Sequence, residues 1–292
     1  MLLKDKNIVI TGSGRGIGKH VAIACAKEGA NVCITSRTID ELNDVKEEIE
    51  QLGNDARVLV HPADITKIDE VESMFKGFQE ELGPLNAVVA NAGWSRRSVT
   101  HEFSSETFAS IMNVNVLGVF NTFKASYPCI KLDEKKNPAR FIITGSAAYP
   151  TAMPKFAAYT ASKYAVVGFM KALELEYRKD YITFNMILPT MVDTQLLRGK
   201  KAGDGQKPPT VMDPWDLNDY YVFLMTDWAR KVSGYLLDIS ELEKLKQMVL
   251  EAPEDAQQDE EKMKDYLKEK DERFYKQLRK LRNLASFFLE KC

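Results

Sequence analysis

The sequence has few cysteines and histidines and no long apolar run. Its four cysteines, Cys25, Cys33, Cys129 and Cys292, are scattered without a Cys-x-x-Cys pair, which predicts reduced thiols and a cytoplasmic protein. The three histidines are dispersed, so no metal site is expected. No apolar stretch approaches the ~20 residues that span a membrane. Strand-like sequence begins by Ile8, so we expect no N-terminal targeting segment and no membrane partner.

Charge of either sign is also not in excess. The 40 Lys and Arg residues and 42 Asp and Glu residues leave a formal net charge of −2 over 292 residues. No basic stripe interrupts this balance, which argues against nucleic acid as a partner. The length suits one large α/β domain with an appendage, and its core needs neither a metal nor a disulfide.

Short β-rich apolar runs alternate with amphipathic segments. This pattern is typical of the α/β fold class with a doubly wound parallel sheet, Rossmann-type, and helices on both faces. Seven strands are expected, near residues 7–11, 31–35, 57–61, 87–91, 141–144, 183–188 and 234–239. Thr38 and Glu41 form a capping-box signature at the start of the second helix. Residues 199–209, rich in Gly, Lys and Pro, are expected to form a mobile loop.

The composition changes after Ser240. We expect a Rossmann-type domain over residues 1–240 and a charged helical extension over residues 241–292. One apolar helix face precedes Pro253, and a second helix carries a stripe that Lys270 interrupts. The first face is Leu242, Leu245 and Val249; the stripe is Met263, Leu267, Phe274, Leu278, Leu281, Ala285 and Phe288. Packing on the parent domain and self-association both fit this stripe.

A glycine-rich segment, Thr-Gly-Ser-Gly-Arg-Gly-Ile-Gly over residues 11–18, follows the first strand and opens a helix. Glycine permits positive φ and close backbone approach, and the free N–H groups of a helix N-terminus attract phosphate. The segment therefore predicts a phosphate-binding loop, although its spacing differs from the Gly-x-Gly-x-x-Gly fingerprint.

Tyr159 and Lys163 are four residues apart, so on a helix they share a face. A neighbouring ammonium lowers the pKa of a Tyr phenol from its ordinary value of about 10, which makes the phenol a usable acid or base. The same spacing occurs at Tyr127 and at Tyr266. Pro128 interrupts the helix at the first, and neither has the Ser that precedes Tyr159 by thirteen residues, Ser146.

In these features the chain resembles the short-chain dehydrogenase/reductase family in its common single-domain form. The resemblance covers residues 3–240 and includes Asp64-Ile65-Thr66, Asn91-Ala92-Gly93, Asn115 in Asn-Val-Leu-Gly, and residues 189–194 after the sixth strand. It implies a catalytic set of Asn115, Ser146, Tyr159 and Lys163. In that set Ser146 would bind the substrate oxygen and Tyr159 would give or take its proton. Lys163 would depress the Tyr pKa and bind the nicotinamide ribose, and Asn115 would hold a water beside Lys163.

The resemblance also implies a cofactor site. Its members would be Gly12, Ser13, Arg15, Gly16, Ile17, Gly18, Ser36, Arg37, Asp64, Ile65, Asn91, Ala92, Gly93, Tyr159, Lys163, Pro189, Val192 and Thr194. In the family an acidic residue at the end of the second strand selects NAD, and here that position is Ser36. Arg15 and Arg37, with no local carboxylate in the sequence, suit a 2′-phosphate. NADP(H) is therefore expected to be preferred over NAD(H).

Two departures from the family pattern bear on cofactor fit and assembly. Thr190 replaces the usual Gly after the sixth strand, which adds bulk near the nicotinamide. Asp238 is followed by Ile-Ser-Glu-Leu instead of the usual glycines, which puts the usual tetramer interface in doubt. A homodimer or homotetramer is expected, with a dimer through the helices that bear Asn115 and Tyr159.

The expected substrate is a small-molecule carbonyl or alcohol. Its pocket would be lined by Trp94, Ser146, Ala148, Tyr149 and Met191. The leading prediction is an NADPH-dependent oxidoreductase that interconverts a carbonyl and a secondary alcohol by hydride transfer. A 3-oxoacyl-thioester reductase, for a carrier protein or CoA, is the enzymatic alternative. A non-catalytic nucleotide-binding scaffold is the third, but it would not need all four catalytic residues.

Overall fold

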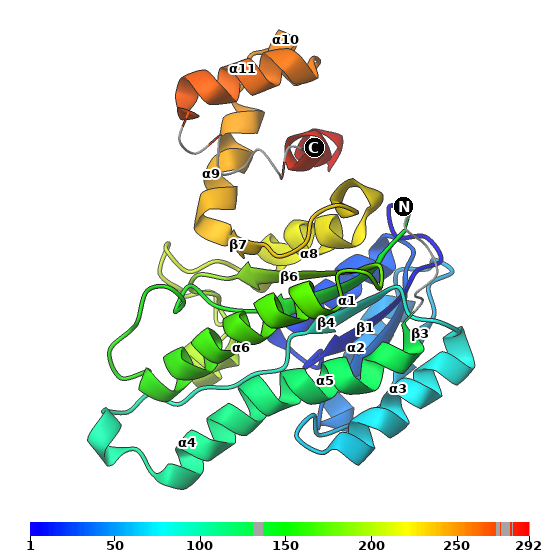
Figure 1. Cartoon of the computed structure of the whole chain (residues 1–292), viewed down its shortest axis with the longest axis vertical. Coiled ribbons are helices and arrows are strands. Elements are labelled where there is room, and N and C mark those ends of the chain that lie inside the picture. Colours follow the sequence, from blue (N-terminus) through cyan, green and yellow to red (C-terminus); the bar gives the residue numbers. More distant parts are fainter. Residues whose placement is uncertain (131–136, 273–274, 276–280, 282, 292) are drawn as a thin grey trace.

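The computed structural model describes residues 1–130, 137–272, 275, 281 and 283–291. Seven parallel strands form one sheet in the order β3-β2-β1-β4-β5-β6-β7, which confirms the predicted fold class (Figure 1). The strands are β1 (Asn7–Thr11), β2 (Asn31–Thr35), β3 (Val58–Val60), β4 (Ala87–Ala90), β5 (Ala139–Thr144), β6 (Ile182–Leu188) and β7 (Leu236–Asp238). All seven occur where the sequence predicted them, with ends that differ by no more than two residues.

Helices cover both faces of the sheet. One face carries α1 (Gly16–Lys27), α2 (Ile39–Glu50) and α8 (Asn218–Met225), and the other carries α3 (Ile68–Leu82), α5 (Gly118–Ser126) and α6 (Ala157–Glu176). Shorter helical segments are α4 (Ser105–Met112), η2 (Asn113–Leu117), α7 (Gln195–Arg198) and the 3-10 turns Thr100–Glu102, Tyr127–Cys129, Gly199–Lys201, Pro214–Leu217 and Asp227–Ala229. Strand side chains alternate between the two cores: Ile8 and Ile10 face α1, whereas Val9 faces the α3 side.

The predicted capping box at α2 is wrong. Thr38 is the N-cap residue, but its side chain makes no capping hydrogen bond. The Glu41 carboxylate lies instead 2.7 Å from the Arg15 guanidinium, because a charge-assisted pair is stronger than a bond to a neutral N–H. The first turn of α2 is thereby joined to the glycine loop.

The C-terminal extension packs on the α8 side of the domain (Figure 1). It comprises α9 (Ile239–Leu250), α10 (Glu254–Gln257), α11 (Glu260–Lys270) and α13 (Asn283–Lys291). The predicted face of α9 is buried, as expected. The single second helix was a wrong prediction, because α11 ends at an extended Asp271. Phe274 and Leu278 lie outside the described residues.

The last helix, α13, provides the aromatic contacts of this extension. Phe287 and Phe288 are fully buried. The Phe288 ring lies 5.8 Å from Tyr220 of α8, and the Phe287 ring lies 5.5 Å from both Phe223 and Trp228. At least the last turn of the apolar stripe therefore packs on the parent domain.

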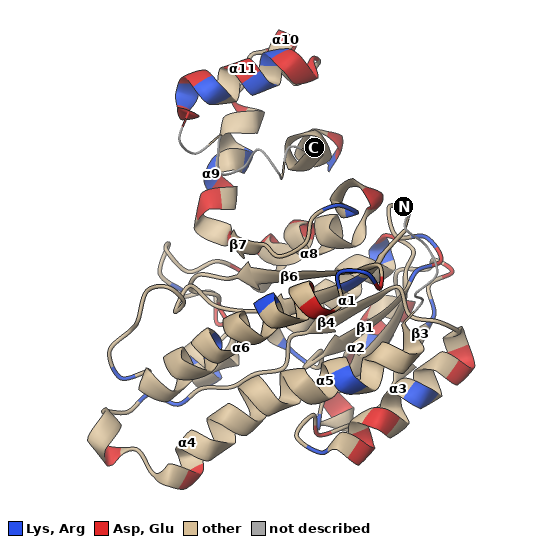
Figure 2. Cartoon of the chain, in the orientation of Figure 1, with Lys and Arg blue, Asp and Glu red and all other residues tan. Residues whose placement is uncertain are grey.

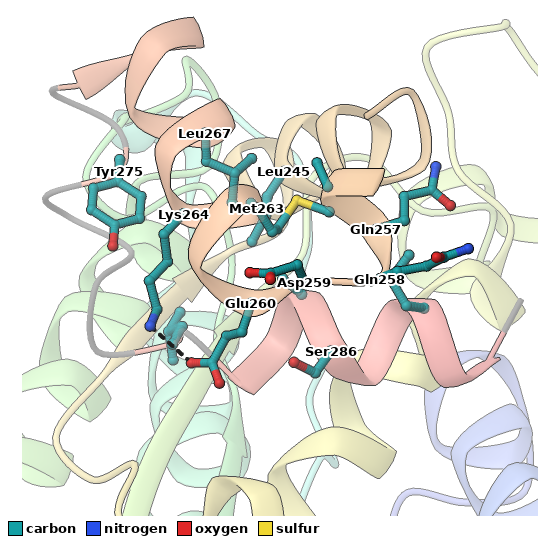
Figure 3. A pocket seen from close by; sticks show the side chains of 14 residues that line it. Leu245, Gln257, Gln258, Asp259, Glu260, Met263, Lys264, Leu267, Tyr275 and Ser286 are labelled. Atoms are coloured by element: carbon teal, nitrogen blue, oxygen red, sulfur yellow. Dashed lines mark ion pairs between the residues drawn. The ribbon is translucent and has the colours of Figure 1, made fainter. Parts of the chain in front are cut away.

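A cavity of about 330 Å³ lies within the extension, between α11 and α13 (Figure 3). Met263 and Leu267 contribute apolar side chains, and Asp259, Glu260 and Lys264 lie around it. Lysine and acidic residues alternate along α11 (Figure 2). None of the cavity's lining residues belongs to the predicted catalytic set.

Residues 199–209, which were expected to be mobile, are joined to their flanking residues by ion pairs, and their mobility stays a prediction. The Arg198 guanidinium donates to both carboxylate oxygens of Asp193 at 3.0 Å and to Asp204 at 2.8 Å. Lys207 pairs with Asp213 at 3.0 Å. Among the described residues, no helix is long and apolar enough to cross a membrane, and no group of His, Cys, Asp and Glu has metal-binding geometry.

Candidate active site

The glycine loop lies where β1 ends and α1 begins, beside the carboxyl end of β4. Gly12 and Gly16 have φ values of +65° and +56°. A Cβ on Gly12 would lie 2.8 Å from the Ala92 Cα, and one on Gly18 would lie 2.4 Å from the Gly12 carbonyl oxygen. Only glycine fits these positions, and the result is a tight turn at a helix N-terminus, which suits a dinucleotide pyrophosphate.

Two predicted cofactor residues, Ser13 and Asn91, form hydrogen bonds from their side chains to the backbone in and around this loop. Ser13 is fully buried, and its hydroxyl donates to the Ile10 carbonyl at 2.9 Å and accepts from the Thr35 N–H at 2.8 Å. The Asn91 amide donates to the carbonyls of Thr11 and Gly12 at 3.0 and 3.2 Å. The side chains of Ser13 and Asn91 thus shape the loop through the protein's own backbone. Ile17 is half-buried on the first turn of α1.

Three predicted catalytic residues come together beyond the end of β5. Ser146 accepts a hydrogen bond from the Ala148 N–H at 3.1 Å. Tyr159, on the first turn of α6, is 8% exposed, and Lys163 follows one turn later. The Lys163 Nζ lies 5.4 Å from the centre of the Tyr159 ring and donates to the Thr144 carbonyl at 2.9 Å. The spacing of four therefore produces the shared helix face that the sequence predicted.

The pKa values of this group are set mainly by burial. Burial raises the pKa of the Tyr159 phenol, and the Ser146 hydroxyl partly opposes that rise. Burial lowers the pKa of Lys163 to about 8. The predicted fall in the Tyr159 pKa is thus wrong for the cofactor-free chain, because the fold that brings the ammonium close also removes water from the phenol. A neutral phenol at pH 7 is equipped to donate a proton.

The hydroxyls of Thr144 and Ser146 face different partners. Thr144 Oγ1 donates to the Asn91 Oδ1 at 3.1 Å and lies 2.7 Å from the Tyr221 hydroxyl of α8. Ser146 is instead the hydroxyl that forms a hydrogen bond with the Tyr159 phenol and opposes the rise in its pKa. The sequence analysis had chosen Ser146 on a different ground, its spacing of thirteen residues to Tyr159.

Asn115 lies in η2, a π-helical turn between α4 and α5. Its Oδ1 accepts the Trp94 N–H at 2.9 Å, and its Nδ2 donates to the Trp94 carbonyl at 3.1 Å and to the Ser162 Oγ at 2.9 Å. Ser162 in turn donates to the Tyr159 carbonyl at 2.7 Å. Protein groups therefore occupy both side-chain donors of Asn115, and the water expected at Asn115 stays a prediction. A Cβ on Gly93 would lie 3.2 Å from the Asn115 Oδ1, so the lack of a side chain at Gly93 lets Asn115 lie close to the segment after β4.

Ser162 is a positioning residue that the sequence analysis missed. It is fully buried and lies between Tyr159 and Lys163. Through Asn115 it ties the Tyr159 turn of α6 to the segment after β4. Its place three residues after Tyr159, on the same helix face, was the available signal.

The end of β2 was expected to hold two arginines without a local carboxylate. Ser36 is indeed uncharged, and Arg37 is exposed. Arg15, however, pairs with Glu41 at 2.7 Å. A Cβ on Gly14 would lie 2.9 Å from the Glu41 Oε2 and 3.0 Å from the Ser36 Oγ. The sequence prediction was wrong on this point, because the tertiary fold brings the Glu41 carboxylate to Ser36.

Asp64 and Ile65 follow β3. Burial raises the pKa of Asp64, but hydrogen bonds from Thr66 and the positive charge of Arg37 outweigh it and lower that pKa. Ile65 is buried, and a Cβ on Gly118 would lie 2.4 Å from its Cδ1. Asp64 thus faces the arginine side of the site, whereas the Ile65 side chain packs against the start of α5.

The segment after β6 lies against the glycine loop. Thr194 is nearest, with its Cγ2 3.2 Å from the place that a Cβ on Gly16 would take. The Thr190 hydroxyl lies 3.4 Å from the Met212 sulfur. Two other predicted cofactor residues here, Pro189 and Val192, are buried.

The predicted substrate residues differ in how exposed they are and in what they contact. Ala148 is buried, and the Tyr149 ring packs edge-on against Tyr164 with centroids 4.6 Å apart. Tyr164 lies five residues beyond the catalytic tyrosine and hence on another side of α6. The Trp94 indole N–H donates to a carbonyl of α4 at 3.3 Å. Met191 is 44% exposed. The places of Trp94, Ala148, Tyr149 and Met191 in a substrate pocket stay predictions.

A smaller cavity lies beside the first turn of α6. It has a volume of about 250 Å³ and is lined by Thr100, Phe103, Ser105, Phe108, Ala157 and Ala158. Because Ala158 precedes Tyr159, this cavity lies next to the catalytic turn, and its lining is mostly apolar.

Comparisons with known proteins agree with this fold. The family described as short chain dehydrogenase matches residues 6–205. A D-beta-hydroxybutyrate dehydrogenase of Cupriavidus necator is 31% identical over 251 residues, which are 80% of this chain and 95% of the relative. A (-)-trans-carveol dehydrogenase of Rhodococcus erythropolis is 28% identical over 265 residues, with 79% and 94% covered.

Two solved structures extend the comparison to cofactor complexes. The 3-ketoacyl-(acyl-carrier-protein) reductase of Brucella melitensis, complexed with NADH, is 29% identical with a TM-score of 0.73, and 81% of this chain and 97% of that chain are covered. An alcohol dehydrogenase from the archaeon Thermococcus sibiricus, complexed with 5-hydroxy-NADP, is 29% identical with a TM-score of 0.71, at 80% and 95% coverage. The chain belongs to the short-chain dehydrogenase/reductase family and is an oxidoreductase that acts on alcohols or carbonyls with a nicotinamide cofactor.

Proposed function

We propose that the protein is an NADPH-dependent reductase that interconverts a carbonyl compound and a secondary alcohol. The observation that carries this proposal is the convergence of Ser146, Tyr159 and Lys163 beyond the end of β5. Arg15 and Arg37 support the choice of NADP(H), because Arg37 directly follows the uncharged Ser36 and is exposed, and Arg15 lies on the adjoining glycine loop. Residues 1–240 would form the catalytic domain and residues 241–292 its helical extension.

Each catalytic side chain has a separate task in the proposed mechanism. When bound, the nicotinamide cofactor supplies or accepts the hydride. Ser146 donates a hydrogen bond to the substrate oxygen, where negative charge develops during reduction. The neutral Tyr159 phenol transfers its proton to that oxygen. The Lys163 ammonium, 5.4 Å from the phenol ring, stabilises the phenolate that remains.

Asn115 and Ser162 hold this arrangement in place. Their hydrogen bonds join the turn of α6 that carries Tyr159 to the segment after β4. Fixed donors need no reorganisation during the reaction, which is the main requirement for stabilising a developing charge. The predicted water at Asn115 would replenish the proton through Lys163.

The substrate class we propose is a ketone paired with its secondary alcohol. The relatives named for D-beta-hydroxybutyrate and (-)-trans-carveol share this functional group, one on an anionic chain and one on an apolar ring. A 3-oxoacyl thioester is the second candidate, because exposed Arg96 and Arg97 follow β4 and suit an anionic carrier. The 3-ketoacyl reductase among the similar structures is consistent with it.

The subunit surface points to a homo-oligomer. Exposed apolar side chains occur together on α4, η2, α5 and α6, namely Phe108, Leu117, Phe120, Tyr164 and Leu175. Such a surface favours burial against a second copy. A homodimer through these helices fits, and a homotetramer would need a further interface beside the extension.

A substrate panel with both cofactors tests the proposal. Purified protein would be mixed with NADPH or NADH and with cyclic ketones, 3-oxo acids or acetoacetyl thioesters, and absorbance of the reduced nicotinamide would be followed. We expect turnover of free ketones with NADPH faster than with NADH. Turnover of thioesters alone would favour the second candidate, and no turnover of any carbonyl, with NADPH bound, would favour a scaffold.

A further inference from the structure

The ion pair between Arg15 and Glu41 joins two elements at the adenosine end of the site. Arg15 belongs to the glycine loop, and Glu41 to the first turn of α2. Their charged atoms are 2.7 Å apart, and their side chains are 56% and 30% exposed. An exposed pair of this kind contributes little stability, so a ligand can exchange either partner at small cost.

The backbone also places Glu41 close to the loop. A Cβ on Gly14 would lie 3.0 Å from the Glu41 Cβ and 2.9 Å from its Oε2. The same position would lie 3.0 Å from the Ser36 Oγ. Glu41 thus brings a carboxylate beside the strand-end residue that is itself uncharged, and Gly14 is what leaves room for it.

A carboxylate at this place weakens the binding of NADP(H) and favours the binding of NAD(H). It repels a 2′-phosphate and occupies the Arg15 guanidinium, which would otherwise bind that phosphate. It can accept a hydrogen bond from a 2′-hydroxyl, as acidic residues do in NAD sites. We infer that Glu41 is a specificity-determining residue that weakens NADP(H) binding through Arg15 and keeps NAD(H) usable. This inference rests on the proposed cofactor site.

The chain offers a matched control on the same two helices. Lys19 of α1 and Glu48 of α2 form a pair at 2.6 Å, with side chains 25% and 45% exposed. Glu48→Gln therefore removes the same charge from the same helix, two turns away from Glu41. It should leave the cofactor preference unchanged.

The test is direct titration of NADPH and NADH into Glu41→Gln and Glu48→Gln, followed by protein fluorescence or calorimetry. We expect Glu41→Gln to lower the NADPH Kd by about fivefold, without lowering the NADH Kd. The difference should shrink in high salt, because both charges are exposed. In an Arg15→Ala background most of the effect should disappear.

The inference is overturned if Glu41→Gln changes the ratio of the two Kd values by less than about twofold, or if Glu48→Gln changes it equally. A wild-type protein that prefers NADH would refute the proposed NADPH preference, but a shift of the ratio in Glu41→Gln would still support the role of Glu41. Thermal melting of both variants checks that the fold is intact.

Discussion

Replacing Phe288 by Ala tests whether the C-terminal extension is part of the folded core. The Phe288 ring is fully buried, packs 5.8 Å from Tyr220 and lies 5.6 Å from the Lys246 ammonium. Truncating a buried Phe costs about 3–5 kcal/mol of unfolding free energy, because it removes apolar burial and leaves a cavity. Each kcal/mol corresponds to roughly 2–4 °C in a protein of this size class. We expect the melting temperature to fall by on the order of 10 °C.

The catalytic set lies on other elements, so turnover of the folded Phe288→Ala variant should stay within about twofold of wild type, as for sites without shared partners. Leu250→Ala is the matched control, because Leu250 is also in the extension but is 41% exposed. It should change stability by less than about 0.5 kcal/mol. Scanning calorimetry of the three proteins decides the matter. If Phe288→Ala melts at the same temperature as wild type, α13 is not packed on α8 and the account of the extension is wrong.

Three further predictions concern the site. Replacing Ser36 by Asp and Arg37 by Ala should weaken NADPH binding relative to NADH, measured by titration, since a carboxylate repels the 2′-phosphate; an unchanged ratio would count against the assigned ribose site. Lys163→Met should abolish turnover yet raise the unfolding free energy of the cofactor-free protein at pH 7 by about 1–3 kcal/mol, because burial lowers the Lys163 pKa to about 8 and the buried ammonium is costly. In wild type the buried Lys163 ammonium lowers the unfolding free energy below pH 8, and this penalty disappears as the pH rises towards the unfolded-state pKa. Urea titrations at several pH values should therefore show that the Lys163 contribution to the unfolding free energy of wild type becomes more favourable above pH 8. Carbonyl reduction should be steady below about pH 8 and decline above it as Lys163 loses its proton; a rate that climbs above pH 8 would contradict these roles.

The sheet was predictable because its signals are local. Each strand is a short apolar run between turn residues, and a fully parallel sheet buried on both faces leaves few alternatives for its order. The shared face of Tyr159 and Lys163 could also be predicted from the sequence, because a spacing of four residues on a helix fixes it without knowledge of the tertiary fold. Ser146 was chosen over Thr144 from its distance in sequence to Tyr159, and the structure places its hydroxyl at the Tyr159 phenol.

The misses share a different cause, which is contact between segments distant in sequence. Glu41 was assigned to a helix cap, yet its partner Arg15 is 26 residues away. The direction of the Tyr159 pKa depends on how much water the surrounding elements exclude, and a sequence does not show this. In each case a local pattern competed with a tertiary contact, and the tertiary contact prevailed.

Pre-steady-state reduction by Tyr159→Phe tests the central claim most directly. The substitution removes one hydroxyl from a side chain that is 8% exposed, so fold and NADPH affinity should be retained. Loss of a general acid lowers turnover by about 10²–10⁴-fold. We expect a fall of this size in the single-turnover rate with a carbonyl substrate. The NADPH Kd should stay within about tenfold of wild type, because a lost hydroxyl contact to the ribose is worth about 0.5–1.5 kcal/mol. A folded, NADPH-saturated Tyr159→Phe protein that reduces the substrate at close to the wild-type rate would contradict the proposed mechanism.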